Sequence, residues 1–154
     1  MNIRYISDIH LEFMNPNKIR KFLINIEPNK DDICVCAGDI GNPYKYHYDM
    51  FMQYMNINFK KIFVIAGNHE YYNDTKDINE TNKYLEEYFK QYENISFLNN
   101  NHEYYDDYCF IGTTLWSNIT NPYYEINDTS KIPNFDYIEY NRLNKICVNY
   151  LEDT

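Results

Sequence analysis

The sequence lacks the long apolar stretches that mark membrane proteins and secreted precursors. No segment approaches the roughly 20 consecutive apolar residues that a membrane-spanning helix requires. The N-terminus runs directly into an apolar alternation, without the basic segment and apolar run of a secretory signal. We therefore expect a cytoplasmic protein with no membrane span.

Basic residues are also scarce. The 154 residues hold 14 Lys and Arg against 23 Asp and Glu, which gives a formal net charge of -9. This balance argues against a general basic surface for nucleic acids or anionic membranes, but it leaves room for an enzyme with a local metal site. Hydrophobic residues make up 44% and charged residues 24%, as is ordinary for a soluble globular domain. We predict a single domain over residues 1–154 and leave its oligomeric state open.

Cysteines are few, and they lack the spacing of a structural zinc site. Such sites prefer paired cysteines with two to four residues between them, and no such pair occurs among positions 34, 36, 109 and 147. Cys34 and Cys36 lie within an apolar run, where a thiol packs as a small hydrophobic group. We therefore expect buried, reduced thiols rather than a metal–thiolate site.

Short apolar runs alternate with helical patterns through the first two thirds of the chain. Runs that are buried on both faces and separated by helices are typical of a parallel sheet built from β-α-β units, so we predict an α/β fold. A hairpin pattern and a polar loop containing Pro122 and Pro133 then precede a last helix. The predicted strands are 3–7, 32–37, 61–66 and 95–98, the helices 16–26, 44–57, 77–92 and 136–151, the hairpin strands 103–105 and 108–113, and the polar loop 118–134.

Polar side chains follow each of the first three predicted strands. Asp8 and His10 follow the first, Asp39 follows the second behind a glycine, and Asn68 and His69 follow the third behind another glycine. In an open parallel sheet, ligands bind outside the carboxyl ends of the strands, so we expect these five side chains to converge on one crevice. Each motif alone also fits a helix cap or a turn, and the interpretation depends on all three occurring in order.

The chemistry of this set favours a metal site. Two carboxylates, an imidazole and an amide oxygen suit divalent ions such as Mn, Fe, Zn or Mg. A central carboxylate can bridge two ions about 3.5–4 Å apart, which is the arrangement of two-metal phosphoester hydrolases. An imidazole that is not a ligand would be free to transfer a proton.

These motifs resemble the first three blocks of the calcineurin-like metallophosphoesterases. The blocks are Asp8-Ile9-His10, Gly38-Asp39 and Gly67-Asn68-His69-Glu70, and their spacing agrees as well. The segments around Glu12 and over residues 112–117 resemble a small single-domain branch of that superfamily in bacteria and viruses. The resemblance implies an α/β sandwich in which a parallel or mixed sheet with flanking helices is followed by a second sheet.

The resemblance also implies a metal-dependent phosphoesterase that attacks phosphomonoesters or phosphodiesters with a metal-bound hydroxide at a dinuclear site. The substrate is then a phosphoester whose type the sequence leaves open, and the cofactors are two divalent ions. Each matching residue takes a role in that scheme. Asp8 and His10 hold the first ion, Asp39 bridges both, Asn68 holds the second, His69 is the catalytic proton donor to the leaving oxygen, and Glu70 tunes His69.

Two later blocks of the family, a strand-end histidine and a Gly-His-x-His, do not occur in this sequence. The remaining histidines are His47, expected on a helix surface, and His102, expected in a turn ahead of the place for a ligand. From side chains alone, the second ion would keep only Asp39 and Asn68, so we expect an incomplete second metal site and second sheet.

Three hypotheses follow from this departure. The domain is a C-terminally truncated phosphoesterase, a homologue that has lost catalysis, or a non-catalytic binding or scaffold module on the same fold. A dinucleotide-binding protein would need Gly-x-Gly-x-x-Gly after the first strand, and that motif does not occur there. The intact ligand set between Asp8 and Glu70 favours the phosphoesterase.

Overall fold

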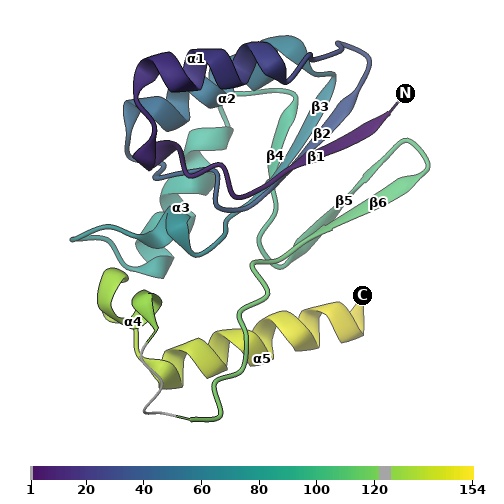
Figure 1. The fold of residues 1–154 in the computed structure, drawn as a ribbon. Helices are drawn as coiled ribbons and strands as arrows, with labels where there is room; N and C mark the ends of the chain where they lie inside the picture. The colour runs from purple at the N-terminus through teal and green to yellow at the C-terminus, as the bar shows by residue number, and fades with distance from the viewer. Residues whose placement is uncertain (1, 122–125) are drawn as a thin grey trace.

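The computed structural model describes residues 2–121 and 126–154, and its centre is a four-stranded parallel sheet (Figure 1). The strands lie in the order β1-β2-β3-β4, which is also their order in the chain. The α/β class is therefore confirmed, and the strands end within two residues of the predicted boundaries. The strands are β1 (Ile3–Ile6), β2 (Ile33–Ala37), β3 (Lys61–Ile65) and β4 (Ile95–Phe97).

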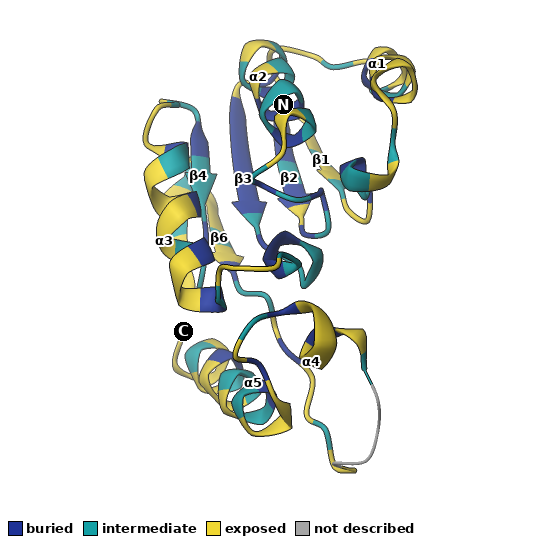
Figure 2. Cartoon of the chain, turned by 90° about the vertical axis from the view of Figure 1, so that its left-hand side faces the viewer, coloured by how far each residue is buried: buried dark blue, intermediate teal, exposed yellow. Residues whose placement is uncertain are grey.

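Three helices connect these strands and cover one face of the sheet (Figure 1). The central strands alternate between two apolar faces, since Ile62 and Val64 pack in the large core with the helices while Phe63 packs on the opposite side. Figure 2 shows β2 and β3 mostly buried, as their apolar runs predict. The helices are α1 (Pro16–Asn25), α2 (Tyr46–Asn58) and α3 (Ile78–Phe89).

Local signals set several helix starts. The Asn15 side chain accepts the Lys18 amide at the start of α1, where Pro16 occupies the first turn. Asp77 and Glu80 form a reciprocal capping box at the start of α3. Each cap satisfies backbone amides that would otherwise lack a partner, so these boundaries fall where the sequence places them.

A two-stranded antiparallel sheet packs against the face of the main sheet that the helices leave free. Its strands are β5 (Asn101–Tyr105) and β6 (Tyr108–Gly112). Phe110 of the hairpin stacks on Phe63 of β3, with ring centroids 4.0 Å apart. The predicted hairpin is confirmed, but its first strand begins two residues earlier, so His102 lies in β5 and not in a turn.

The C-terminal part contains more regular structure than its polar sequence predicts. The expected loop 118–134 includes the short helix α4 (Asn127–Lys131), while Pro122 falls outside the described residues. The last helix, α5 (Tyr137–Asp153), is confirmed. Trp116 packs between Tyr71 of the main body and Tyr140 of α5, so this segment joins the large core.

The cysteines follow expectation at three of four positions. Cys34, Cys36 and Cys147 are free and buried, whereas Cys109 is free but exposed on β6. Cys109 lies on the same face of the hairpin as Tyr104 and Ile111, whose side chains are exposed as well. Across residues 2–121 and 126–154, we find no helix with both the length and the apolar character to cross a membrane.

Candidate metal centre

The loops that leave the first three strands meet at one edge of the sheet. Asp8, His10 and Asp39 each offer one ligand atom there, and these atoms all lie within 4.8 Å of one another. Backbone bonds align the first two loops, since the Asp8 amide donates to the Gly38 carbonyl at 3.1 Å and the His10 amide to the Asp39 carbonyl at 3.0 Å. Two carboxylates and one imidazole at this separation fit a divalent transition-metal ion.

All three of these residues have left-handed backbone conformations. The φ angles are 54° at Asp8, 53° at His10 and 53° at Asp39. Left-handed backbone at a non-glycine residue costs on the order of 1–3 kcal/mol and tends to occur where function requires a side chain to point in a particular direction. The strained turns here aim three potential ligands at a single point.

Two glycines allow the second and third loops to touch. A Cβ atom on Gly38, whose φ is 85°, would lie 2.8 Å from the Gly67 amide nitrogen. A Cβ atom on Gly67 would lie 2.2 Å from Oδ1 of Asp39. Gly67 is therefore required by the space that the Asp39 carboxylate occupies, and Gly38 by both space and conformation.

Glu70 links the same two loops by accepting hydrogen bonds from the backbone of each. Its carboxylate is fully buried and accepts the backbone amides of Asp39 (3.0 Å), Ile40 (2.8 Å), Gly41 (3.2 Å) and Gly67 (2.6 Å). Burial raises the pKa of Glu70 to about 7, and the nearby Asp39 charge adds to the increase, while the amide donors oppose it. The carboxylate thus fixes the backbone that carries Asp39.

His69 lies beside His10. Its backbone amide donates to Oδ1 of Asp39 at 2.9 Å, and its Nδ1 is 3.1 Å from Nδ1 of His10. Oε1 of Glu12 is 2.8 Å from the His69 Nδ1. The resemblance implied that Glu70 tunes His69, but the Glu70 oxygens bind backbone amides, and the carboxylate that contacts the His69 ring belongs to Glu12.

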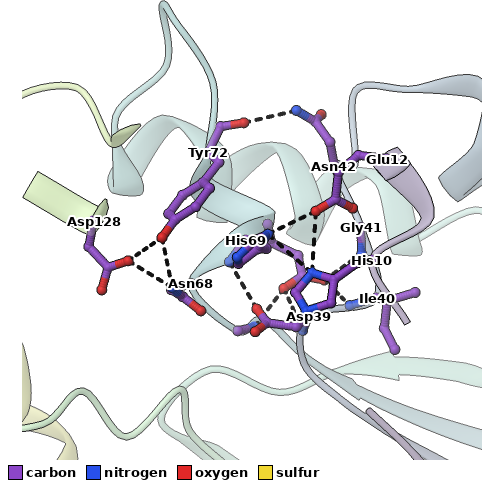
Figure 3. A network of polar contacts seen from close by, with 12 residues as sticks. His10, Glu12, Asp39, Ile40, Gly41, Asn42, Asn68, His69, Tyr72 and Asp128 are labelled. Carbon is purple, nitrogen blue, oxygen red and sulfur yellow. Dashed lines mark hydrogen bonds and ion pairs between the residues drawn. The ribbon is translucent and has the colours of Figure 1, made fainter. Parts of the chain in front are cut away.

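Asn68 is held by two residues that the motifs do not include. Its side-chain nitrogen donates to the Tyr72 hydroxyl at 3.0 Å and to Oδ1 of Asp128 at 2.7 Å (Figure 3). A carboxylate accepts but does not donate, so the amide nitrogen must face Asp128 and the amide oxygen is left for another partner. Asp128 is buried in α4, inside a segment predicted as loop, and no motif or periodicity in the sequence distinguishes it.

A cavity of about 330 Å³ lies at the ends of these strands, and the lining residues do not include His10 or His69. Asp8, Asp39 and Asn68 line one side of it. The other side comes from residues 114–117, Asp128 and Tyr140. The lining therefore brings together the three strand ends and the segment that the family resemblance at residues 112–117 already marked.

The remaining histidines lie elsewhere. His47 is in α2 and His102 is in β5, where its Nδ1 is 3.2 Å from the Tyr150 hydroxyl. Within the described residues, neither belongs to a group of side chains close enough to hold an ion with the strand-end residues. The candidate ligands are therefore Asp8, His10 and Asp39, beside a second group of His10, Glu12 and His69 whose ligand atoms also lie within 4.8 Å of one another.

Comparison with known proteins finds one family that matches nearly the full length of the chain. A family model described as calcineurin-like phosphoesterase matches residues 1–153. A relative from Acanthamoeba polyphaga mimivirus, named uncharacterized protein L509, is 36% identical over 160 residues. The match covers 96% of this chain and 56% of the relative, so the chain spans little more than half of the relative's length. No solved structure matches the chain.

Proposed function

We propose that this chain, which belongs to the calcineurin-like phosphoesterase family, hydrolyses phosphoester bonds at a site that holds two divalent ions. The observation that carries the proposal is the convergence of Asp8, His10 and Asp39 within 4.8 Å at the carboxyl ends of adjacent parallel strands. In this scheme Asp39 would serve as a ligand of both ions and Asn68 as a ligand of the second. Mn, Fe, Zn and Mg all suit the donor atoms.

The surrounding residues suit the separate roles of metal binding and proton donation in such a reaction. Divalent ions, when bound, lower the pKa of water and neutralise the charge of phosphoryl oxygens. Glu70 and Gly67 keep the Asp39 carboxylate in place, because one binds its backbone and the other leaves room for its side chain. His69, which lies next to His10, would deliver the proton that the leaving oxygen needs.

A non-catalytic binding or scaffold module is the second candidate. The observation that favours it is the short ligand list for the second ion, since Asp39 and Asn68 are its only candidates from the motifs and no further histidine in residues 2–121 and 126–154 joins them. A module of this kind would bind a metal ion without turning over a phosphoester.

Metal-dependent hydrolysis separates the two candidates. The chain is assayed with p-nitrophenyl phosphate and bis(p-nitrophenyl) phosphate, with Mn²⁺ and with a chelator, beside Asp39→Ala and the exposed control Asp153→Ala on α5. We expect Mn²⁺-dependent release of p-nitrophenolate that the chelator and Asp39→Ala abolish and the control retains. Metal binding without turnover would support the scaffold, and turnover that survives the chelator would contradict the proposal.

A further inference from the structure

Glu12 occupies a position between two histidines of the site. It lies in the short 3-10 helix η1 (Leu11–Phe13) just after β1, and its Oε1 is 2.8 Å from Nδ1 of His69 and 3.4 Å from Nδ1 of His10. Both Nδ1 atoms therefore face the same carboxylate oxygen. Figure 3 shows the other ring nitrogen of His10 on the side of Asp39.

The surroundings of Glu12 provide room for this arrangement. A Cβ atom on Gly41 would lie 3.2 Å from Oε2 of Glu12 and 2.9 Å from Cβ of Leu11, and the φ of Gly41 is 156°. Oε2 is itself buried and has no hydrogen-bond partner among the described residues. The ion pairs of Glu12 in that part of the chain go to the two imidazoles and to no lysine or arginine. The Glu12 side chain is 18% exposed, and ion pairs of such partly exposed carboxylates contribute little to stability, so orienting the imidazoles is the better account of its position.

Chemistry then fixes what the two rings can do. A carboxylate oxygen accepts but does not donate, so a ring that bonds it carries a proton on Nδ1. In a neutral imidazole that tautomer leaves a free electron pair on Nε2. A histidine that binds a metal commonly donates its other ring N–H to a carboxylate in this way.

Building on the phosphoesterase function proposed above, we propose that Glu12 is the positioning residue for His10 and His69 together. Its Oε1 accepts from Nδ1–H of both rings, whose Nδ1 atoms are 3.1 Å apart and would otherwise bond each other. This leaves the electron pair on Nε2 of His10 for the first ion. His69 would act as the imidazolium, which gives its Nε2 proton to the leaving oxygen and is left as the neutral Nδ1–H tautomer. The metal ligand and the proton donor are thus oriented by one carboxylate, in place of the ligand role that the grouping of Glu12 with His10 and His69 would also allow.

The direct test is the tautomer of each ring in the metal-free protein. Long-range ¹H–¹⁵N NMR distinguishes the two nitrogens, and it is recorded well above the ordinary histidine pKa of about 6.5. In the wild type we expect His10 and His69 as Nδ1–H tautomers. In Glu12→Ala no oxygen is left to accept from either ring, and the two Nδ1 atoms, 3.1 Å apart, would bond each other, so one of the rings should lose its Nδ1 proton. His47 and His102 serve as internal controls, and Glu86→Ala, on the exposed side of α3, is the matched variant.

Turnover gives the second readout. Glu12→Ala should lower both Zn²⁺ affinity and kcat by about 10–100-fold, the usual effect of removing a residue that orients a ligand. The loss in kcat should be larger with phenyl phosphate than with p-nitrophenyl phosphate, because a poor leaving group depends more on a well-placed proton donor. Glu86→Ala should match the wild type in every measurement.

The outcomes separate this proposal from the proposed function. Unchanged tautomers of His10 and His69 in Glu12→Ala would overturn the positioning role, whatever the activity. Direct coordination of Zn²⁺ by His69, visible in its ring nitrogen shifts, would also overturn it. A wild-type chain that shows the expected tautomers but no metal-dependent turnover would refute the phosphoesterase and leave the orientation by Glu12 standing.

Discussion

At the residue scale, several requirements meet on Asp39. A carboxylate oxygen of Asp39 lies within 4.8 Å of ligand atoms of Asp8 and His10. Its Oδ1 also accepts a hydrogen bond from the His69 amide. Its backbone is left-handed, and its amide is bonded to buried Glu70. A side chain that is constrained from so many directions can hold an ion without reorganising when the ion binds.

His69 has a role that can be separated from metal binding. We predict that His69→Ala lowers kcat about 10²–10⁴-fold, the range for a positioned general acid, and leaves the metal content nearly intact. The loss should shrink for p-nitrophenyl phosphate, since p-nitrophenolate leaves without a proton. Steady-state kinetics and metal analysis of the same preparations provide the measurement. Parallel loss of metal and activity would make His69 a ligand instead.

Glu70 should make stability depend on pH. Its pKa is raised to about 7 in the folded state by burial, against about 4.3 in an unfolded chain. Between these values the folded protein binds a proton that the unfolded chain has lost, so the free energy of unfolding falls as pH rises through this window. The decrease is on the order of 3 kcal/mol and levels off above pH of about 7.

Chemical denaturation of the metal-free protein across that window checks the prediction. Glu70→Gln cannot titrate, so its stability should lose this part of the pH dependence, while Glu86→Gln should retain it. Curves for Glu70→Gln and the wild type that run parallel between pH of about 4.5 and about 7 would show that Glu70 is ionised throughout.

At the scale of elements, the site depends on where strands end. The strand ends could be predicted because the apolar runs of β2 and β3 stop at glycine, and the residues after them are polar. Parallel strands bring those ends to one edge, so Asp8, Asp39 and Asn68 could be placed together before their distances were known.

Other parts of the site could not be predicted from local patterns. Asp128 reaches Asn68 across 60 residues from a polar segment without periodicity, and its five-residue helix is too short to give a helical signal. The role of Glu12 likewise depends on contact with His69, 57 residues away. Long-range contacts between irregular segments are set by the packing of the whole domain.

The approach of the second and third loops can be tested with a single methyl group. In Gly67→Ala the new Cβ atom would lie 2.2 Å from Oδ1 of Asp39, so the carboxylate must move. We predict a destabilisation of about 1–3 kcal/mol and a loss of Mn²⁺ affinity of at least about tenfold.

Gly112→Ala is the matched control for that variant. Its Cβ atom would lie 2.1 Å from Cβ of Leu98, under the hairpin, and Gly112 is not among the residues that line the cavity at the strand ends. It should lose a similar amount of stability and keep its Mn²⁺ affinity, as measured by calorimetry and thermal unfolding. Equal Mn²⁺ affinity in Gly67→Ala and the wild type would show that Asp39 has more freedom than the structure indicates.

At the scale of the whole molecule, the two sheets leave apolar edges exposed. β1 is an edge strand on which Tyr5 is 81% exposed, and Ile111 of β6 is 46% exposed. Exposed edge strands with apolar side chains favour association between chains. We predict that the isolated chain associates at high concentration and unfolds over a broad temperature range.

Sedimentation velocity of the wild type and of variants with lysine at the exposed edges tests the predicted association. Tyr5→Lys combined with Ile111→Lys should shift the chain toward monomer, whereas Ile57→Lys, an exposed residue of α2, should not. A wild-type chain that is a clean monomer with a sharp cooperative melt would show that these edges are adequately protected.

The central claim is that Asp8, His10 and Asp39 form a site for divalent metal ions, and titration calorimetry with Mn²⁺ tests it most directly. The wild-type chain should bind one ion tightly and a second more weakly, because Asp39 and Asn68 alone supply the second site from the strand ends. Asp39→Ala should lose both binding events, since it removes a ligand of each ion. Equal Mn²⁺ binding by the wild type and by Asp39→Ala would contradict the account.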